Sequence, residues 1–197
     1  RWAPYHEKNN QAPKQLSQER HPSLAYSEIP DFMASLRQRT NTAAMALEVL
    51  ILTALRTKSL IDATWDEIDF STNVWTVPIE HLKDKKHRTE PMRVPLAPRV
   101  RQLLETLAQI RESKFVFPGQ KTGRSLTDMA LLSCLHKMNR DGSGQTRWRD
   151  PIDGRSVVPH GFRATFRTWT EEQTNFPTAV AEQALGHQVG TEVERAY

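Results

Sequence analysis

The chain has 197 residues, a formal net charge of +4 and one cysteine. This length suffices to bury a hydrophobic core in one domain, and the modest positive charge suits an anionic partner without requiring one. Because Cys134 is the only cysteine, an internal disulfide framework is excluded, and its apolar neighbours predict a buried thiol. No apolar run approaches the roughly 20 residues that would cross a bilayer, so we expect no membrane partner.

The first 25 residues are polar, and they contain prolines at positions 4, 13 and 22 without apolar periodicity. This composition predicts that residues 1–25 are a linker leading into the folded domain. The chain opens with Arg1 and not with methionine, which indicates a fragment of a longer protein. We therefore place the folded domain at residues 26–197.

Two helices are predicted next. The first is capped by Ser27 and carries apolar residues on one face: Ile29, Phe32, Met33 and Leu36. The second runs from Thr42 through Leu55 and is apolar nearly all round, which predicts a core helix. Arg56 closes this helix. A charged residue in that position is either a partner of the helix dipole or a functional group in a cleft, and the position alone leaves both open.

A small antiparallel sheet is predicted between residues 65 and 94. Residues 65–70 and 74–77 are β-prone and flank a turn at Ser71-Thr72-Asn73, and Met92-Arg93-Val94 offers a third short strand. The segment between the second and third strands, residues 79–91, is rich in lysine and arginine. A solvated hairpin loop explains this charge as well as a binding site does.

The remainder of the chain is predicted to be mainly helical. Helices are expected at Pro98–Ile110, Thr127–Met138, Gly161–Gln173, Pro177–Leu185 and Val189–Tyr197. Residues 139–158 contain four arginines, three glycines and a proline, which is typical of a mobile basic loop. The predicted fold class is therefore mainly α with a small three-stranded antiparallel β-sheet (α+β).

One pair of residues suggests a phosphate-binding site. His160 and Arg163 lie three positions apart, so if a helix begins at Gly161 both side chains can point to one side. The amides of a helix N-terminus and an arginine fork together make a receptor for a phosphate oxygen. Taken alone, such a pair is more commonly a helix cap or a surface pair. It gains weight from four further residues: Arg56, Lys83, His187 and Tyr197.

Short stretches along the chain match a known family in order and spacing. They are Leu52-Thr53-Ala54-Leu55-Arg56, Trp65-Asp66-Glu67-Ile68-Asp69, Val94-Pro95-Leu96, His160-Gly161-Phe162-Arg163, Leu185-Gly186-His187 and Arg195-Ala196-Tyr197. From about Pro22 to Tyr197 the chain resembles the catalytic domain of the tyrosine recombinases, the phage-integrase family, and within it the prophage and genomic-island integrases. The resemblance implies the tyrosine recombinase catalytic-domain fold. It also implies that residues 1–25 join a missing N-terminal DNA-binding domain and that the catalytic domain, 26–197, is truncated at its nucleophile.

The resemblance implies roles for the basic residues of the set. Arg56 and Arg163 are similar to the two arginines that clamp the scissile phosphate. Lys83 is similar in placement to the general acid that protonates the leaving 5′-oxygen, although Lys85 and Lys86 are neighbouring candidates. We also expect four basic residues to contact DNA: Lys85, Lys86, Arg88 and Arg167.

The resemblance implies roles for two histidines and a tyrosine as well. His160 matches the histidine proposed to help handle the tyrosine proton, and His187 matches the one that hydrogen-bonds the phosphate. Tyr197, ten residues beyond His187, matches the nucleophile that forms a 3′-phosphotyrosyl link. Without the other residues, Tyr197 would be read as an ordinary residue of an amphipathic tail.

These residue types suit the implied chemistry. A tyrosine nucleophile keeps the bond energy of the cut strand in a phosphodiester, but its free pKa of about 10 calls for a proton acceptor or nearby cations. Two arginines present permanently charged forks to the phosphate, and a lysine can protonate the leaving oxygen. We expect no cofactor and no metal, because none of the seven histidines forms a close pair such as His-x-x-x-His.

Two residues depart from the family pattern. Ala54 stands where a glycine usually precedes the arginine, and Ser59 replaces an acidic residue that normally supports that arginine. We therefore expect Arg56 to be held less firmly. A decayed DNA-binding remnant without catalysis is one alternative that follows from this.

The leading function is the site-specific cutting and rejoining of DNA for integration or excision of mobile DNA. A type IB topoisomerase, which shares the chemistry, is the enzyme alternative, but the Leu185-Gly186-His187 motif and the nearby Tyr197 favour recombination. Expected partners are double-stranded DNA attachment sites and, for the full-length protein, further copies in a tetramer on DNA. Host DNA-bending or directionality factors are further candidate partners, and the expected location is the bacterial cytoplasm, at the nucleoid.

Overall fold

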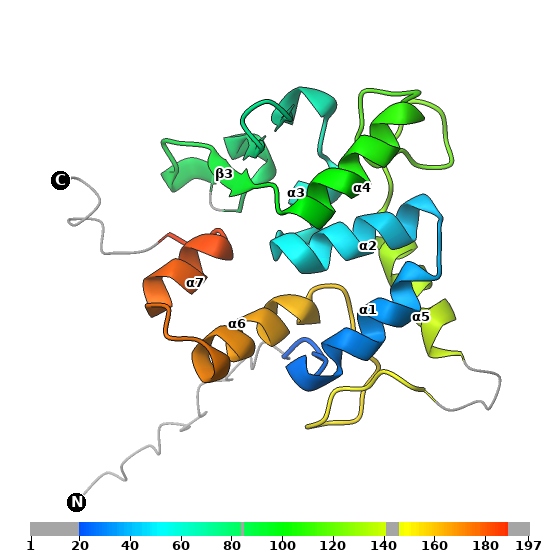
Figure 1. Cartoon of the computed structure of the whole chain (residues 1–197), viewed down its shortest axis with the longest axis vertical. Helices are drawn as coiled ribbons and strands as arrows, with labels where there is room; N and C mark the ends of the chain where they lie inside the picture. Colours follow the sequence, from blue (N-terminus) through cyan, green and yellow to red (C-terminus); the bar gives the residue numbers. More distant parts are fainter. Residues whose placement is uncertain (1–19, 84, 141–145, 189–197) are drawn as a thin grey trace, which may run out of the picture.

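The structure, a computed structural model, describes residues 20–83, 85–140 and 146–188. Within these residues, one small sheet lies at the edge of a group of helices, at the upper left of Figure 1. The α-helices are α1 (Ile29–Arg37), α2 (Thr42–Thr53), α3 (Thr57–Ile61), α4 (Pro98–Gln109), α5 (Asp128–Asn139), α6 (Gly161–Gln173) and α7 (Thr178–Ala184). The strands are β1 (Ile68–Asp69), β2 (Val74–Val77) and β3 (Met92–Pro95). The predicted class, mainly α with a three-stranded antiparallel sheet, is confirmed, while the helix predicted at residues 189–197 lies outside the described residues.

Helix α2 is the centre of the core. It contacts α1, α3, α4 and α5, and in Figure 1 it crosses the middle of the molecule between α4 and α1. The Asn41 side chain caps its N-terminus by accepting the Ala44 backbone N–H at 3.0 Å. Five residues of the helix are at most 2% exposed: Ala44, Ala46, Leu47, Val49 and Leu50. The prediction of a core helix is confirmed.

Helix α2 ends two residues earlier than predicted. Ala54 adopts the left-handed conformation, with φ +51° and ψ +20°, and this stops the helix at Thr53. Arg56 therefore does not close α2. It follows the turn in extended backbone (φ −71°, ψ 144°) and precedes α3, a short helix that the sequence did not predict.

One buried carboxylate ties three helices together. The Glu48 side chain on α2 is 4% exposed. It accepts the Arg37 Nε–H from α1 at 2.7 Å, and from α4 it accepts the Arg99 Nε–H at 2.9 Å and Nη2–H at 3.0 Å. Burial alone would raise the pKa of Glu48, but the hydrogen bonds from the two arginines outweigh it and the pKa is lowered. Glu48 is therefore ionised in the fold and joins α1, α2 and α4.

The sheet has the strand order β1-β2-β3 and is antiparallel throughout. Trp75 in the central strand pairs with Ile68 on one side and with Val94 on the other. Trp75 and Val77 are fully buried while Thr76 between them is exposed, which is the alternation that places one face of the sheet on the core. The predicted hairpin and third strand are confirmed.

Strand β1 is shorter than predicted. Residues Trp65–Glu67 form a 3₁₀ turn and not the start of a strand, because Thr64 and Glu67 make a capping box around that turn. The Glu67 carboxylate accepts the Thr64 backbone N–H at 3.1 Å and also the Trp75 indole N–H at 2.9 Å. Glu67 therefore fixes the turn against the central strand.

The described end of the predicted linker, residues 20–25, packs on the folded domain. Leu24 is 2% exposed and belongs to the core. A 3₁₀ turn at Tyr26–Glu28 follows it, so the N-cap of α1 is Glu28 and not Ser27 as predicted. Pro30 fits the first turn of α1 because no N–H is needed there.

The predicted mobile basic loop, residues 139–158, is described except for residues 141–145. Contrary to the prediction, its described part is packed: Trp148 is 3% exposed and Asp150 is 1% exposed. The Asn139 side chain accepts the Trp148 backbone N–H at 2.7 Å and donates to the Trp148 carbonyl at 3.3 Å. Burial of the large Trp148 side chain stabilises this part of the loop, although glycines and arginines flank it in the sequence.

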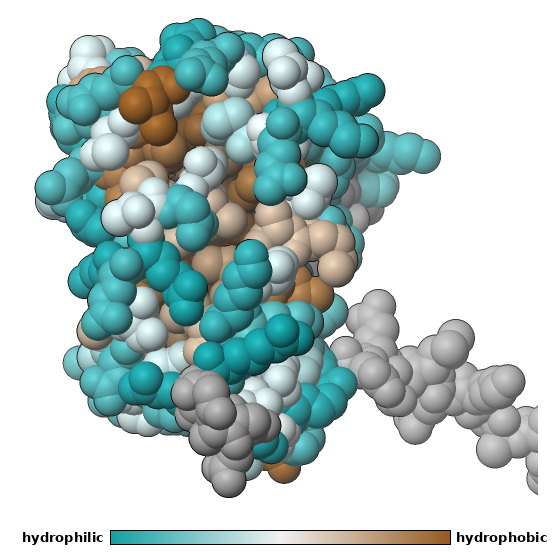
Figure 2. All heavy atoms as spheres, turned by 90° about the vertical axis from the view of Figure 1, so that its right-hand side faces the viewer, coloured by the Kyte–Doolittle hydropathy of each residue, from teal (hydrophilic) through white to brown (hydrophobic). Residues whose placement is uncertain are grey.

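Exposed apolar residues come from many elements. The face at the right of Figure 1 is mostly hydrophilic, with apolar side chains showing between the polar ones (Figure 2). The exposed large apolar residues are Leu52, Ile110, Met129, Ile152, Trp169, Phe176 and Val180. Across the part of the chain that the structure describes, no helix is long and apolar enough to cross a membrane.

Candidate active site

Arg163 is the most buried cation of the predicted set. It lies on the first turn of α6 and is 7% exposed. Its Nη1 donates to the Ala54 carbonyl after α2, and its Nη2 donates to the Leu185 carbonyl after α7 at 2.7 Å. Burial, and after it the charge of Arg56, lower the pKa of Arg163 to about 10, which still leaves it charged at neutral pH. No carboxylate pairs with Arg163 among the described residues, so its charge can serve an anion.

Arg56 approaches the same place from the turn between α2 and α3. Its Nη1 donates to the Gly186 carbonyl at 3.2 Å. Gly186 has φ +64°, and a Cβ there would lie 2.9 Å from the Met92 Sδ and 3.6 Å from the Arg56 Nη1. Glycine at position 186 therefore gives the left-handed turn without strain and avoids a close approach to the Met92 Sδ.

The His187 ring contacts the Arg163 guanidinium. Its Nε2 is 3.2 Å from the Arg163 Nη2, and its Nδ1 contacts the Glu182 carboxylate on α7. A guanidinium can only donate, so Nε2 is the acceptor and the proton lies on Nδ1, facing Glu182. Burial and the charges of Arg56 and Arg163 lower the pKa of His187, so the ring is neutral at neutral pH.

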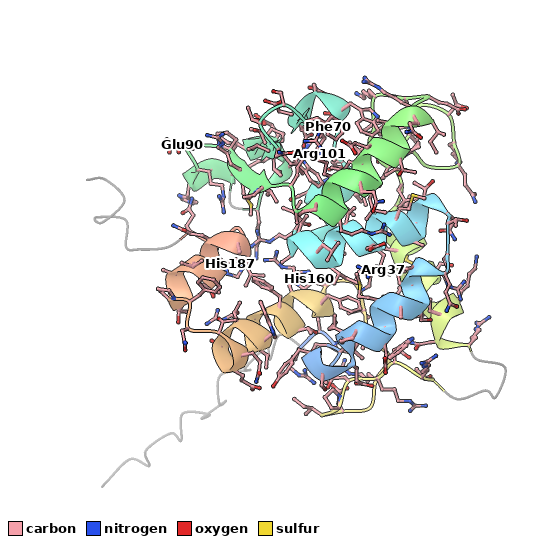
Figure 3. All side chains as sticks on the ribbon, in the orientation of Figure 1. Arg37, Phe70, Glu90, Arg101, His160 and His187 are labelled. Carbon is pink, nitrogen blue, oxygen red and sulfur yellow. The ribbon has the colours of Figure 1, made fainter. Side chains whose placement is uncertain are left out.

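His160 occupies the N-cap position of α6. Figure 3 shows both histidines on the side of α6 and α7 that faces α2. Burial of part of the His160 ring is the largest of the effects that lower its pKa to about 4, followed by its neighbours His21, Arg163, Arg56 and Lys83. The ring is therefore neutral at physiological pH and can accept a proton.

The loop between β2 and β3 reaches the site from the sheet. Lys83 is exposed, and its charge lowers the pKa of both His160 and His187, which places it near the two rings. Arg88 donates from Nε to the Lys83 carbonyl at 3.3 Å and from Nη2 to the Gly186 carbonyl, the same oxygen that accepts from Arg56. The loop is therefore fastened to the segment after α7.

Of the other predicted residues, Arg167 borders this cluster, because its charge is among those that lower the pKa of His187. Lys85 and Lys86 are exposed in a 3₁₀ turn of the loop. Arg167 pairs with Glu171 at 2.8 Å and with Glu182, so its guanidinium ties α6 to α7. DNA contact by these residues stays a prediction. Tyr197 lies outside the described residues.

The structure thus brings together five of the predicted residues: Arg56, Lys83, His160, Arg163 and His187. Together they form a basic site with two neutral imidazoles, which can bind a phosphate and accept a proton. In the described ranges, no group of three or more His, Cys, Asp or Glu residues could hold a metal ion. Cys134 is buried, and burial raises the pKa of its thiol, which makes it a poor nucleophile.

Residues 22–197 match the sequence family described as the phage integrase family. The chain belongs to this family. Among its relatives are the prophage integrase IntA of Escherichia coli K12 (28% identical, covering 89% of this chain and 39% of IntA) and the integrase of Enterobacteria phage P4 (29%, covering 90% and 40%). The integrase of Shigella phage Sf6 is 30% identical, with 89% and 42% covered. The chain thus spans about two fifths of the length of the curated relatives it matches.

Solved structures of integrases and recombinases share the fold. The Tn1549 transposon integrase in complex with circular intermediate DNA matches with a TM-score of 0.66 at 18% identity, covering 92% of this chain and 63% of that one. A lambda integrase dimer bound to a core site matches with a TM-score of 0.59 at 16% identity, covering 91% and 60%. These matches confirm the predicted tyrosine recombinase catalytic-domain fold.

The two departures from the phage integrase pattern have structural roles. Ala54 takes the left-handed conformation that a glycine would adopt without strain, and its carbonyl accepts from Arg163. Ser59 is 1% exposed, and its hydroxyl donates to the His81 carbonyl at 2.6 Å, which fastens α3 to the turn that leads into the loop of Lys83.

Two neighbours of the site were not predicted from the sequence. Glu182 contacts His187 and Arg167, and the only signal for it was a carboxylate five residues before a predicted site histidine. His21 packs its ring against His160, with ring centroids 4.5 Å apart and planes at 62°. His21 fell within the predicted linker, where nothing pointed to a contact with the site.

Proposed function

We propose that this chain is the catalytic domain of a site-specific DNA recombinase, which cuts and rejoins DNA strands through a 3′-phosphotyrosine intermediate during integration or excision of mobile DNA. The observation that carries the proposal is the convergence of Arg56 and Arg163 beside two neutral histidines. Arg163 is held by carbonyl oxygens, which orient its fork without neutralising its charge. Membership of the phage integrase family supports the reaction class.

The arginines would act on the non-bridging oxygens of the scissile phosphate. Negative charge gathers on these oxygens as the phosphate becomes pentacoordinate, and prearranged cations stabilise that charge without reorganising. The carbonyls that hold Arg163 belong to the segments after α2 and α7, and Arg56 is held at Gly186 after α7. The positions of the two arginines therefore depend on how α7 packs against the rest of the domain.

Each proton transfer has a candidate residue. Tyr197 would attack phosphorus, its proton would pass to the neutral His160, and Lys83 would protonate the leaving 5′-oxygen. His187 orients Arg163 through Nε2. When His187 takes up a proton it can donate from Nε2 to a phosphate oxygen, and Glu182 behind Nδ1 would balance the new charge.

The partners follow from the same proposal. The substrate would be a double-stranded DNA attachment site, with a tetramer as the working assembly of the full-length protein. A structure of lambda integrase, a tetramer bound to a Holliday junction, supports this assembly by its shared fold. The linker role of residues 1–25, an upstream DNA-binding domain, host factors and a place at the bacterial nucleoid stay proposals.

The deciding experiment is covalent trapping. A DNA duplex from the attachment region, nicked beside the scissile phosphate, loses the short strand after cleavage and traps the protein on DNA. Denaturing electrophoresis should show an adduct that forms in excess chelator and is absent for Tyr197→Phe. Binding without an adduct would identify a non-catalytic remnant. An adduct together with supercoil relaxation, but without strand exchange between two sites in the full-length protein, would identify topoisomerase activity instead.

A further inference from the structure

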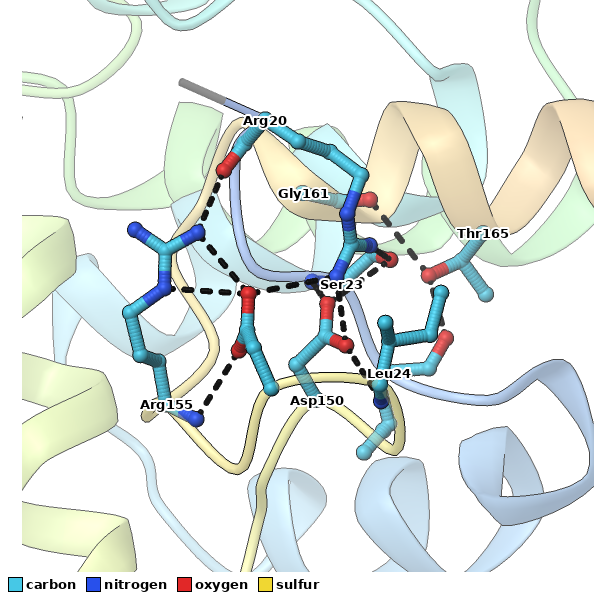
Figure 4. A network of polar contacts seen from close by, with 9 residues as sticks. Arg20, Ser23, Leu24, Asp150, Arg155, Gly161 and Thr165 are labelled. Atoms are coloured by element: carbon cyan, nitrogen blue, oxygen red, sulfur yellow. Dashed lines mark hydrogen bonds and ion pairs between the residues drawn. The ribbon is translucent and has the colours of Figure 1, made fainter.

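Residues 20–24, which we call the lead-in segment, are fastened to the start of α6 and to the loop before it (Figure 4). The buried Asp150 accepts the Ser23 backbone N–H at 2.6 Å and the Arg20 Nη2–H at 2.7 Å. The Leu24 carbonyl accepts the Thr165 hydroxyl of α6 at 2.6 Å. These bonds connect a segment that precedes every helix of the domain with the helix that carries the active site.

The lead-in segment also lies directly against the first residue of α6. A Cβ on Gly161 would overlap the Pro22 carbonyl oxygen and would lie 3.0 Å from the Ser23 Cα. The Pro22 carbonyl in turn accepts the Val158 backbone N–H at 3.3 Å. The glycine of the His160-Gly161-Phe162-Arg163 motif is therefore needed for this close packing.

The packing of the lead-in segment places the His21 ring against the His160 ring. The two rings meet edge to face, with centroids 4.5 Å apart. Within the described ranges, the His160 side chain makes no hydrogen bond, and His21 is the ring that contacts it. The orientation of His160 therefore depends on where the lead-in segment places His21.

We propose that His21 is a positioning residue for His160, and that the lead-in segment couples the chain upstream of the domain to proton transfer in the active site. The second part of this inference rests on the proposed recombinase function. A ring edge against His160 restricts its rotation and shields one side from water, which keeps the imidazole neutral and aimed into the site. A displacement of the lead-in segment by an upstream part of the chain would move the His21 ring and so change the orientation and the pKa of His160.

The charged neighbours of His160 define what a change at His21 should do. Arg163 from its own helix, Arg56 before α3 and Lys83 from the β2–β3 loop all disfavour its protonation, as does His21 itself. Removing the His21 ring leaves the three cations in place but exposes more of the His160 ring to water. We expect the pKa of His160 to rise from about 4 toward the ordinary value of 6.5.

The test compares His21→Ala, His21→Phe and, as a matched control, His136→Ala, which removes an exposed histidine of α5. NMR titration of the whole chain gives the pKa of His160, and trapping on the nicked duplex gives the cleavage rate. For His21→Ala we expect the raised pKa, and a loss of about tenfold in rate because the unrestrained His160 ring is aimed at the tyrosine less often, with DNA affinity and melting temperature unchanged. His21→Phe keeps a ring edge and should keep most of the rate. Arg20→Ala, which loosens the lead-in segment, should raise the pKa in the same direction.

Two outcomes would overturn the inference. One is an unchanged His160 pKa in His21→Ala, whatever the cleavage rate. The other is an equal loss in His21→Ala and His21→Phe that follows DNA affinity, because His21 would then be a DNA contact. If the wild-type chain forms no adduct, the recombinase proposal fails, whereas the titration still decides whether His21 positions His160.

Discussion

Arg163 is buried and charged, and burial of a charge lowers the stability of the fold unless an opposite charge compensates it. Its hydrogen bonds go to carbonyl oxygens, which satisfy the N–H groups but leave the positive charge unbalanced. Its neighbour Arg56 lowers its pKa further, so the pair is electrostatically strained in the protein alone. A bound phosphate would relieve this repulsion, which is why we regard the two arginines as a binding site and not as structural residues.

Arg163→Ala should therefore lower the rate of strand cleavage far more than it lowers DNA binding. Removing one prearranged donor from a developing oxyanion costs about 10²–10³ in rate, whereas DNA affinity is spread over many phosphate contacts. Trapping kinetics and a gel-shift titration measure the two quantities. Arg124→Ala, which removes an exposed arginine of the loop before α5, is the control for loss of an arginine. Parallel losses in cleavage and affinity would show that Arg163 only docks DNA.

Ala54 carries backbone strain that a glycine would remove. The left-handed conformation costs a residue with a Cβ about 1–2 kcal/mol, and the greater freedom of glycine in the unfolded chain offsets about 0.5–1 kcal/mol of the gain. We expect Ala54→Gly to stabilise the fold by about 0.5–1 kcal/mol in urea denaturation. Ala108→Gly, inside α4, should destabilise it by about as much. A destabilised Ala54→Gly variant would mean that the strain at residue 54 is absent in solution.

At the scale of elements, the ion cluster of α1, α2 and α4 tests how far buried charge supports the fold. Glu48→Ala leaves Arg37 and Arg99 without their partner and opens a buried site on α2. We expect a loss of about 3 kcal/mol in the free energy of unfolding. Glu105→Ala is the matched control, because its pair with Arg101 is exposed and should contribute less than about 1 kcal/mol. Equal effects would show that burial of the Glu48 pair is unimportant.

The elements with strong periodicity were predictable from sequence, and those that depend on distant contacts were not. Helix α6 has the bounds that its apolar spacing predicts, and α4 differs by one residue. The turn at Ala54 was not predictable, because alanine normally favours a helix and only the hydrogen bond to Arg163 and the start of α3 explain its conformation. His21 was not predictable either, because its place depends on Asp150, far along the chain.

The site residues were predictable as a set but not in their contacts. Resemblance to a family supplied their identities, and the fold brings the described members together. Arg56 and Arg88 both donate to the Gly186 carbonyl, and Glu182 contacts the His187 ring. These contacts depend on how α7 packs on the rest of the domain. Sequence spacing carries no such information.

At the scale of the whole molecule, carboxylates hold distant segments together, while cations line the active site. Glu48 joins three helices, and Asp150 joins the lead-in segment to the loop before α6. The hydrogen bond from Arg20 is the main reason that the pKa of Asp150 lies well below its usual range. Acid should therefore remove the contacts between segments and at the same time increase the positive charge of the site.

The stability of the fold should fall with acid in two windows. His160 is neutral in the fold down to about pH 4, whereas an unfolded histidine takes up its proton near pH 6.5. The unfolded chain thus binds more protons between these values, and stability declines as the pH falls from 6.5 to 4. Glu48 and Asp150 have lowered pKa values, so their contribution is present above the ordinary carboxyl pKa of about 4 and is lost as the pH falls further.

Melting temperatures from pH 7.5 to pH 3 measure both windows. His160→Gln should make the decline between pH 6.5 and pH 4 shallower, leaving the part due to His187, whose pKa is also lowered, without changing the steeper fall below it. Asp150→Asn should be less stable than the wild type at pH 7 and should lose less on acidification, because its contribution is already gone. A wild-type profile that is level down to pH 4, or one that His160→Gln leaves unchanged, would contradict a lowered pKa of His160 among the site cations.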